Sequence, residues 1–409
     1  MQKKLLGLAV AGALAAPGLA LAQVEVYGFV NMSVGKFKYS ESTAGAPSVS
    51  KWDVASHASN YGIRGRENVG GGQTAWFQIE QNAPMERSNN VAITPASRNS
   101  AVGMQGAWGN AFIGQWTTPW ADLDALWSVG TVGGWGPVTS IIGRRETTGT
   151  APNPNCINNH SSGGGPIAGV TPCDAVDAAG GVGHPFWRRV SQAVFYQSPV
   201  FAGVQVKLAY QTNESKATAG ATVASADPSL WSTSVQWAGM GGRLRVGAAF
   251  DAHKDFTTIG ETDSGFAVKG GWNFGFADLG LAFESMTYKT AAGDCDAKQW
   301  GLALAVPIGQ GAIRASYAVA DDLDDAACGA PAGPAGSGAG DNGAKTWNLG
   351  YEYRFSKRTT VGFGYAAIEN DAAGAFSWTG QPPNANGATA VAAAGSDPST
   401  FFVNMVHRF

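Results

Sequence analysis

Residues 299–306 read QWGLALAV, and this short stretch decides the fold because large apolar side chains occupy every second position. They are Trp300, Leu302, Leu304 and Val306, and Gly or Ala separates them. A period of two places all four side chains on one face of an extended chain. The stretch therefore predicts a β-strand with one apolar face.

The same period recurs along the chain in runs of about ten residues. It passes through 204–210, 231–237, 244–250, 266–274, 313–319, 347–355 and 361–365. Two folds accommodate such strands. A soluble sandwich buries the apolar faces between two sheets, whereas a membrane barrel turns them toward lipid.

The connections between these runs favour the barrel, because short turns alternate with long polar or Gly-rich loops. The short turns lie near 69–72, 108–110, 198–203, 238–242, 275–278, 307–311 and 356–357. The long loops lie near 40–56, 83–97, 117–187, 214–229, 253–263, 290–297, 321–344 and 369–398. Seven short and eight long connections predict sixteen strands. We therefore expect an all-β fold, a 16-stranded antiparallel transmembrane β-barrel with short periplasmic turns and long outer loops.

The first 22 residues have the features of an export signal. Lys3 and Lys4 precede an apolar run over 5–16, and the small residues Ala20 and Ala22 flank Leu21 before Gln23. The apolar run is too short to cross a bilayer as a helix. We expect residues 1–22 to be a signal peptide and 23–409 to form one barrel domain.

Composition and motifs exclude several other classes of protein. The 27 Lys and Arg against 30 Asp and Glu give a net charge of −3, so no basic footprint for nucleic acid exists. The five histidines accompany no nucleophile motif, and neither CxxC nor His at ligand spacing suggests zinc. We expect no enzymatic activity, no cofactor and no metal.

Several segments carry a resemblance to a known family. They are VEVYGFVNMSV at 24–34, YGIRGRENVGGG at 61–72, AVFYQSPVFAGVQV at 193–206, SKRT at 356–359 and the final Phe409. Together they resemble the general diffusion porins of Gram-negative bacteria, in particular the betaproteobacterial branch. The resemblance implies a homotrimer in the outer membrane, in contact with lipid and lipopolysaccharide. It also implies a water-filled channel for passive diffusion of small hydrophilic solutes and ions.

The resemblance further implies that the third long loop, 117–187, folds into the lumen and narrows the pore. Its start, TTPWADLDALW at 117–127, predicts a short helix after Pro119, with Asp122 and Asp124 toward the lumen. The tryptophans of this region, 116, 120, 127 and 135, either pin the loop to the wall or line a track that stacks sugars or aromatic acids. A solute-selective channel is therefore the alternative function, and a non-conducting adhesive barrel is a second one.

Charged residues on the inner face predict the ion preference. By the parity of the apolar positions, more basic than acidic side chains point inward. The inward candidates for the pore lining are Arg64, Arg189, Lys207, Arg243, Arg245, Arg314, Arg354 and the acid Glu80. The resemblance places Arg98 and Arg189 on this basic wall, whereas Asn60 stands where relatives often carry arginine. A basic pore concentrates anions, so we expect a mild anion preference, weakened at Asn60. Arg188 is expected to face the other way, at the rim.

The four cysteines, Cys156, Cys173, Cys295 and Cys328, all fall in predicted outer loops. Export into an oxidising compartment favours disulfides, and four cysteines allow three pairings. We expect Cys156 to pair with Cys173 and Cys295 with Cys328.

Overall fold

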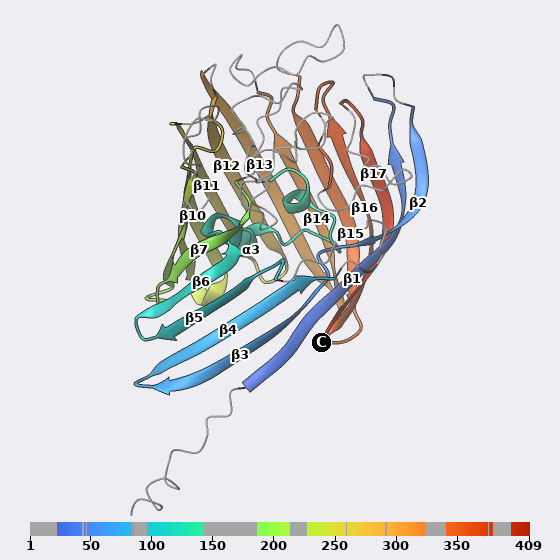
Figure 1. Cartoon of the computed structure of the whole chain (residues 1–409). Coiled ribbons are helices and arrows are strands. Elements are labelled where there is room, and N and C mark those ends of the chain that lie inside the picture. Colours follow the sequence, from blue (N-terminus) through green and yellow to red (C-terminus); the bar gives the residue numbers. More distant parts are fainter. Residues whose placement is uncertain are drawn as a thin grey trace, which may run out of the picture.

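The computed structural model describes residues 23–42, 45, 47–83, 85, 96–142, 186–212, 227–258, 260–290, 293–323, 341–374, 376–378 and 394–409. Its strands form one antiparallel sheet, which closes because the last strand pairs with the first (Figure 1). Among the described residues, no helix has the length and hydropathy needed to cross a bilayer. The expected signal peptide lies outside the described residues.

The sheet contains seventeen strand segments that make sixteen barrel strands. They are β1 (Gln23–Tyr39), β2 (Val49–Ser56), β3 (Asn60–Gly70), β4 (Gln73–Asn82), β5 (Ser100–Gly106), β6 (Gly109–Thr117), β7 (Arg189–Gln197), β8 (Val204–Gln211), β9 (Ser229–Gly239), β10 (Leu244–Lys254), β11 (Thr262–Asn273), β12 (Asp278–Thr290), β13 (Gly293–Ile308), β14 (Gly311–Ala320), β15 (Ala344–Arg354), β16 (Thr359–Asn370) and β17 (Pro398–Arg408). Segments β2 and β3 pair in succession with the same edge of β1, so they count as one interrupted strand. The predicted sixteen-stranded barrel is confirmed.

Residues that alternate along each strand in the sequence point alternately to the inside and the outside of the barrel in the structure. Along β13, Ala297 and Ala303 are buried, whereas Trp300, Leu302 and Leu304 are exposed. The same large apolar side chains that the sequence places on one face therefore cover the outer surface of a closed sheet, as a lipid-facing barrel requires. A soluble sandwich would have buried them, so that alternative is wrong.

Two predicted loops are partly strands. Segment β2 occupies the second half of the loop expected at 40–56, and β13 begins inside the loop expected at 290–297. In both places polar residues alternate with apolar or small ones, for example Lys51, Trp52 and Asp53 in β2. Polar strand ends of this kind look like loops when only apolar runs are counted, which is why the prediction ended the strands too early.

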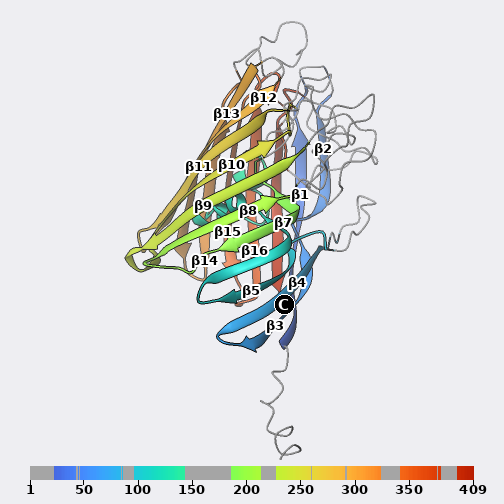
Figure 2. The same cartoon turned by 60° about the vertical axis from the view of Figure 1, so that its left-hand side comes forward.

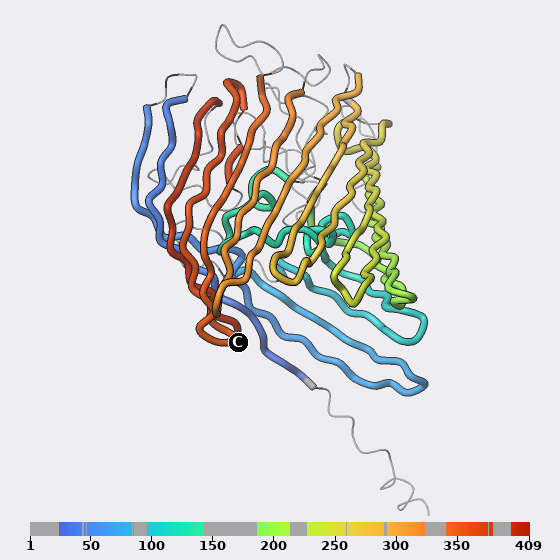
Figure 3. Tube along the Cα trace, turned by 180° about the vertical axis from the view of Figure 1, so that it is seen from behind, coloured from blue at the N-terminus to red at the C-terminus, as the bar shows by residue number. Residues whose placement is uncertain are grey.

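The barrel wall has unequal strand lengths on its two sides. Strands β5 and β8 have 7 and 8 residues, whereas β12 and β13 have 13 and 16. We call β4–β8 the low wall and β9–β16 the tall wall. The low wall slants across the barrel in Figure 2, and the long strands of the tall wall stand together in Figure 3.

Candidate conduction pathway

After β6 the chain enters the barrel and forms two short helices, α2 (Pro119–Asp122) and α3 (Asp124–Trp127), followed by the 3₁₀ turn η1 (Pro137–Thr139) (Figure 1). The Thr118 side chain caps α2 by accepting a hydrogen bond from the Ala121 N–H, and Pro119 fits the first helical turn. The helix expected after Pro119 is confirmed. We call residues 117–142 the inner segment. Residues 143–185 of the expected third loop lie outside the described residues.

The inner segment follows the wall around the lumen. Helix α2 packs on β9 and β10, and α3 on β11 and β12. Further along, the Gly130 carbonyl accepts a hydrogen bond from Asn348 on β15, and the Gly133 carbonyl accepts one from Asn31 on β1. Trp135 then packs against Phe37 and Phe402 at the seam of the barrel. The inner segment therefore reduces the open cross-section by lining the wall.

Glycines in the tall wall allow this close approach. A Cβ added at Gly280 would lie 1.8 Å from the Trp127 carbonyl oxygen, and one at Gly301 would lie 2.8 Å from the Trp127 ring. Trp120, Trp127 and Trp135 are each 0% exposed. These three indoles therefore pin the inner segment to the wall, and they offer no free face to a passing solute.

A buried ion triad fixes the helices to the tall wall. The Lys269 ammonium lies 2.6 Å from an Asp124 oxygen of α3 and 2.7 Å from a Glu284 oxygen of β12. The Trp127 indole N–H donates to Asp124 and the Trp120 indole N–H to Glu284, both at 3.1 Å. Because the triad is buried, removal of one member would leave an uncompensated charge in a medium of low polarity.

Three further basic side chains of the wall hold the inner segment. Lys207 on β8 pairs with Asp122 at 2.8 Å. Arg245 on β10 donates to the Leu126 carbonyl and pairs with Asp278 on β12 at 2.7 Å.

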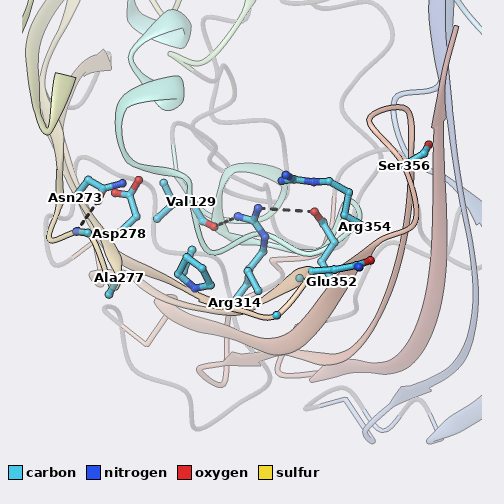
Figure 4. A pocket seen from close by; sticks show the side chains of 15 residues that line it. Val129, Asn273, Ala277, Asp278, Arg314, Glu352, Arg354 and Ser356 are labelled. Carbon is cyan, nitrogen blue, oxygen red and sulfur yellow. Dashed lines mark hydrogen bonds and ion pairs between the residues drawn. The ribbon is translucent and has the colours of Figure 1, made fainter. Parts of the chain in front are cut away.

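Arg314 on β14 donates to the Val129 carbonyl and faces Glu352 at 3.7 Å (Figure 4). These groups border a cavity of about 650 Å³ at the end of the barrel where the short turns lie, which also contains Arg354. Of the predicted lining residues, Asp122, Lys207, Arg245 and Arg314 lie at the inner segment. Asp124 is buried between α3 and the tall wall, so its predicted position facing the lumen is wrong.

The low wall and the start of the sheet carry a second charged group. Arg98 pairs with Glu80 at 2.6 Å, and the Tyr27 hydroxyl donates to the other Glu80 oxygen. Arg64 pairs with Glu25 at 2.9 Å and lies over the Tyr27 ring.

Arg189 also belongs to this part of the wall. Its Nε donates to the Asn99 side chain at 2.7 Å, and no ion pair involves Arg189 among the described residues. Asn60 is buried, and its side-chain amide donates to the Ala58 carbonyl, so it contributes no charge.

Two arginines differ from their predicted places. Arg243 lies beside the turn η3 (Met240–Gly242), where it donates to the Asn273 and Phe274 carbonyls, so it belongs to the rim. Arg188 is 2% exposed and lies over the Phe256 ring, so its predicted rim position is wrong. The cause is a register shift between β6 and β7, where Gln192 has a φ of 54°. An extra residue of this kind reverses the parity of the strand, so parity no longer places Arg189 in the lumen. Its contacts do: Asn99, which accepts from Arg189, donates to the Thr117 hydroxyl, and that hydroxyl donates to the Asp122 carboxylate of the inner segment.

Sequence reasoning missed the partners that neutralise the basic wall. Glu25 and Asp278 were not assigned to the lumen, and Lys269 with Glu284 was not recognised as the anchor of α3. The sequence contained one signal for the contact between Lys269 and Glu284. Both have the inward parity, and in the register of β11 and β12 Glu284 lies opposite Ala267, two residues from Lys269 on the same face. Their contact with Asp124 depends on the tertiary path of the inner segment.

The cysteine prediction is tested at one position only. Cys295 is buried in β13 and is disulfide-bonded, so its assignment to a loop was wrong. The other three cysteines lie outside the described residues. The pairs Cys156–Cys173 and Cys295–Cys328 therefore stay predictions.

A closed antiparallel barrel with apolar side chains outside, ion pairs inside and a chain segment folded into its lumen defines a transmembrane channel of the β-barrel class. The model of the Gram-negative porin family matches residues 7–373. The chain belongs to this family. It is a channel of the outer membrane for passive diffusion.

The sequence identity to individual relatives is low. The outer membrane porin protein 32 of Delftia acidovorans is 24% identical over 90% of each chain. A major outer membrane protein P.IB of Neisseria gonorrhoeae is 31% identical over 127 residues, which span 31% of this chain and 35% of that protein.

Among solved structures, the anion-selective porin from Comamonas acidovorans superposes with a TM-score of 0.67 at 22% identity, over 95% of this chain and all of that one. OmpT of Vibrio cholerae in its trimer form superposes with a TM-score of 0.58 at 15% identity, over 95% of this chain and 99% of that one.

Proposed function

We propose that this porin passes small hydrophilic solutes and inorganic ions with a mild preference for anions. The observation that carries the proposal is the uneven pairing of charges in the lumen. On the tall wall, Arg245, Arg314 and Lys269 each face an acid, and Lys207 on β8 faces Asp122 of the inner segment. Toward the low wall, Arg98 has Glu80, but Arg189 and the exposed Arg66 have no ion-pair partner among the described residues.

Arg66 and Arg189 lie on one side of the aqueous path, and Arg354 on β15, also without an ion pair in the described part of the chain, adds positive charge at the end where the short turns lie. Low-polarity walls strengthen the field of these groups. Because most basic groups are neutralised and Asn60 adds no charge, the preference is mild. One relative's structure is described as that of an anion-selective porin, which agrees with this sign.

The test is the reversal potential of single channels in a KCl gradient. We expect the sign of an anion-preferring pore, and Arg189→Gln should move the potential toward cations by more than the rim control Arg243→Gln. A cation-preferring wild type would refute the proposal. An unchanged potential in Arg189→Gln would remove Arg189 from the constriction.

We also propose a homotrimer embedded in outer-membrane lipid and lipopolysaccharide. The seven residues of β5 extend only roughly 23 Å, less than the hydrocarbon core of about 30 Å. A neighbouring protomer can cover a wall that is too low for lipid, and one structural relative is described in a trimer form. Cross-linking in native membranes should give a trimer band, and a monomer alone would refute the assembly.

Residues 1–22 are proposed to be removed on export. Sequencing of the purified protein should start at Gln23. An intact amino terminus in the outer membrane would contradict this.

A further inference from the structure

An aromatic cluster lies on the inner face of the low wall, where a channel lining is usually polar. Phe112 stacks on Phe195 at 4.8 Å between ring centroids, with planes 7° apart. Trp116 lies 5.2 Å from Phe112, and Trp76 lies 5.3 Å from Phe112 and 6.0 Å from Trp116. We call these four residues the aromatic platform.

Strand parity shows that the platform faces the lumen. Ile113 and Val194, the neighbours of Phe112 and Phe195, are exposed apolar side chains of the outer surface. Trp76 is brought into the same row because Gly103 lies opposite both Trp76 and Phe112.

Phe112 and Phe195 are the buried members of the platform, whereas Trp76 and Trp116 remain partly exposed. Unlike the three buried tryptophans of the inner segment, these two indoles present aromatic surface to the aqueous path.

Positive charge flanks the platform at both ends. Arg66 is the cross-strand partner of Trp76, which places their Cβ atoms about 5 Å apart. Arg189 pairs with Thr117, directly after Trp116. Neither arginine has an ion pair within the described part of the chain, so each retains N–H groups for a carboxylate.

We propose that the aromatic platform is a subsite for aromatic carboxylates, in which the indoles of Trp76 and Trp116 stack on the ring and a flanking arginine binds the carboxylate. The flat apolar surface of the indoles favours an aromatic ring, and the positive charge of the arginines favours a carboxylate. This inference rests on the proposed function, because it names a class of anions that binds inside an anion-preferring pore during passage.

The experiment compares three solutes as blockers of the chloride current through single channels. Benzoate is tested against cyclohexanecarboxylate, which has the same charge and nearly the same size, and against uncharged benzyl alcohol. We expect benzoate to halve the current at a concentration roughly two- to tenfold lower than cyclohexanecarboxylate. Benzyl alcohol should block far less than benzoate.

Variants assign this difference to the platform. Trp116→Leu should abolish the advantage of benzoate over cyclohexanecarboxylate, and Arg189→Gln should weaken block by both carboxylates. Trp231→Leu is the matched control, since this indole is 53% exposed on the outer surface. If Trp116→Leu fails to assemble, Trp76→Leu takes its place, and the wild-type comparison requires no variant.

Equal block by the two carboxylates in the wild type would overturn the inference, as would an undiminished benzoate advantage in the tryptophan variants. A channel without current, or one that prefers cations, would instead overturn the proposed function. The two failures are therefore distinct.

Discussion

The tall wall and the low wall enclose the same lumen but use their inner faces differently. The tall wall is covered by α2 and α3, its glycines admit the helix backbone, and Lys269 is enclosed by two acids. The low wall keeps Trp76 and Trp116 partly exposed and leaves Arg189 without an acid. One side therefore sets the width of the channel, whereas the other is free to interact with solutes.

The comparison shows that a count of inward charges does not predict the field in a pore. Sequence parity assigns most basic residues to one undivided ring. In the structure, Asp124 and Asp278 neutralise Lys269 and Arg245 on the tall wall, and Asp122 neutralises Lys207 on β8. The ion selectivity of the pore thus depends on which arginines have no acidic partner.

The largest effect is expected from Lys269→Met. Loss of the ammonium leaves Asp124 and Glu284 buried together without a counter-charge, at a cost of about 3–5 kcal/mol. Urea unfolding in lipid vesicles should show this destabilisation, and single channels should become noisy as α3 detaches. Lys207→Met is the control, because its pair with Asp122 is partly exposed and should cost less. Equal losses would show that the triad is no special anchor.

Gly280→Leu is expected to act through the width of the pore. The new side chain occupies the position of the Trp127 carbonyl and pushes α3 away from the wall, at about 1–3 kcal/mol. Single-channel conductance should fall, because the displaced helix moves into the lumen. Leu281→Ala changes the lipid-facing neighbour and should leave conductance unchanged. Normal conductance in Gly280→Leu would mean that the helices do not set the width.

Glu80→Gln tests the other wall. It removes the acid that faces Arg98, so the potential near Arg189 becomes more positive. The reversal potential should move further toward anions, opposite in direction to Arg189→Gln. A shift toward cations would place Glu80 away from the conduction path.

The smallest effect is expected outside the membrane, at Asp371. Burial, followed by the nearby Asp322 and Asp341, raises the pKa of this carboxyl. Because the folded state holds the proton more tightly than the unfolded state, ionisation of Asp371 lowers stability as pH rises through the raised pKa. Asp371→Asn should thus stabilise the barrel by a few tenths of a kcal/mol at pH 7. The gain should vanish as the pH falls below the raised pKa, and a gain that grows in acid would contradict this cause.

The sequence was sufficient for the barrel but not for its lumen. Period-two runs such as 299–306 are local, so the strand count and the lipid-facing side chains could be predicted. The short helix that begins at Pro119 could be predicted as well, because the local sequence supplies an N-cap at Thr118 and a proline in the first turn.

The parts that failed depend on distant contacts or on one irregular residue. The position of Arg188 changed through the bulge at Gln192, and the triad of Lys269 joins three segments far apart in the chain. The aromatic platform depends on strand register across β4–β7, which apolar periodicity does not specify.

The seam between β1 and β17 has a consequence for assembly. Gly28 and Phe409 exchange both backbone hydrogen bonds. One edge of β1, the first strand to be synthesised, therefore stays unpaired until β17, the last strand, is available. Until that final strand arrives, every partial sheet has two unpaired edges, which hydrocarbon does not tolerate. The protein must therefore reach the bilayer as a whole chain and seal there in a late step, and trimming a few residues after Pro398 should stop biogenesis more completely than trimming any outer loop.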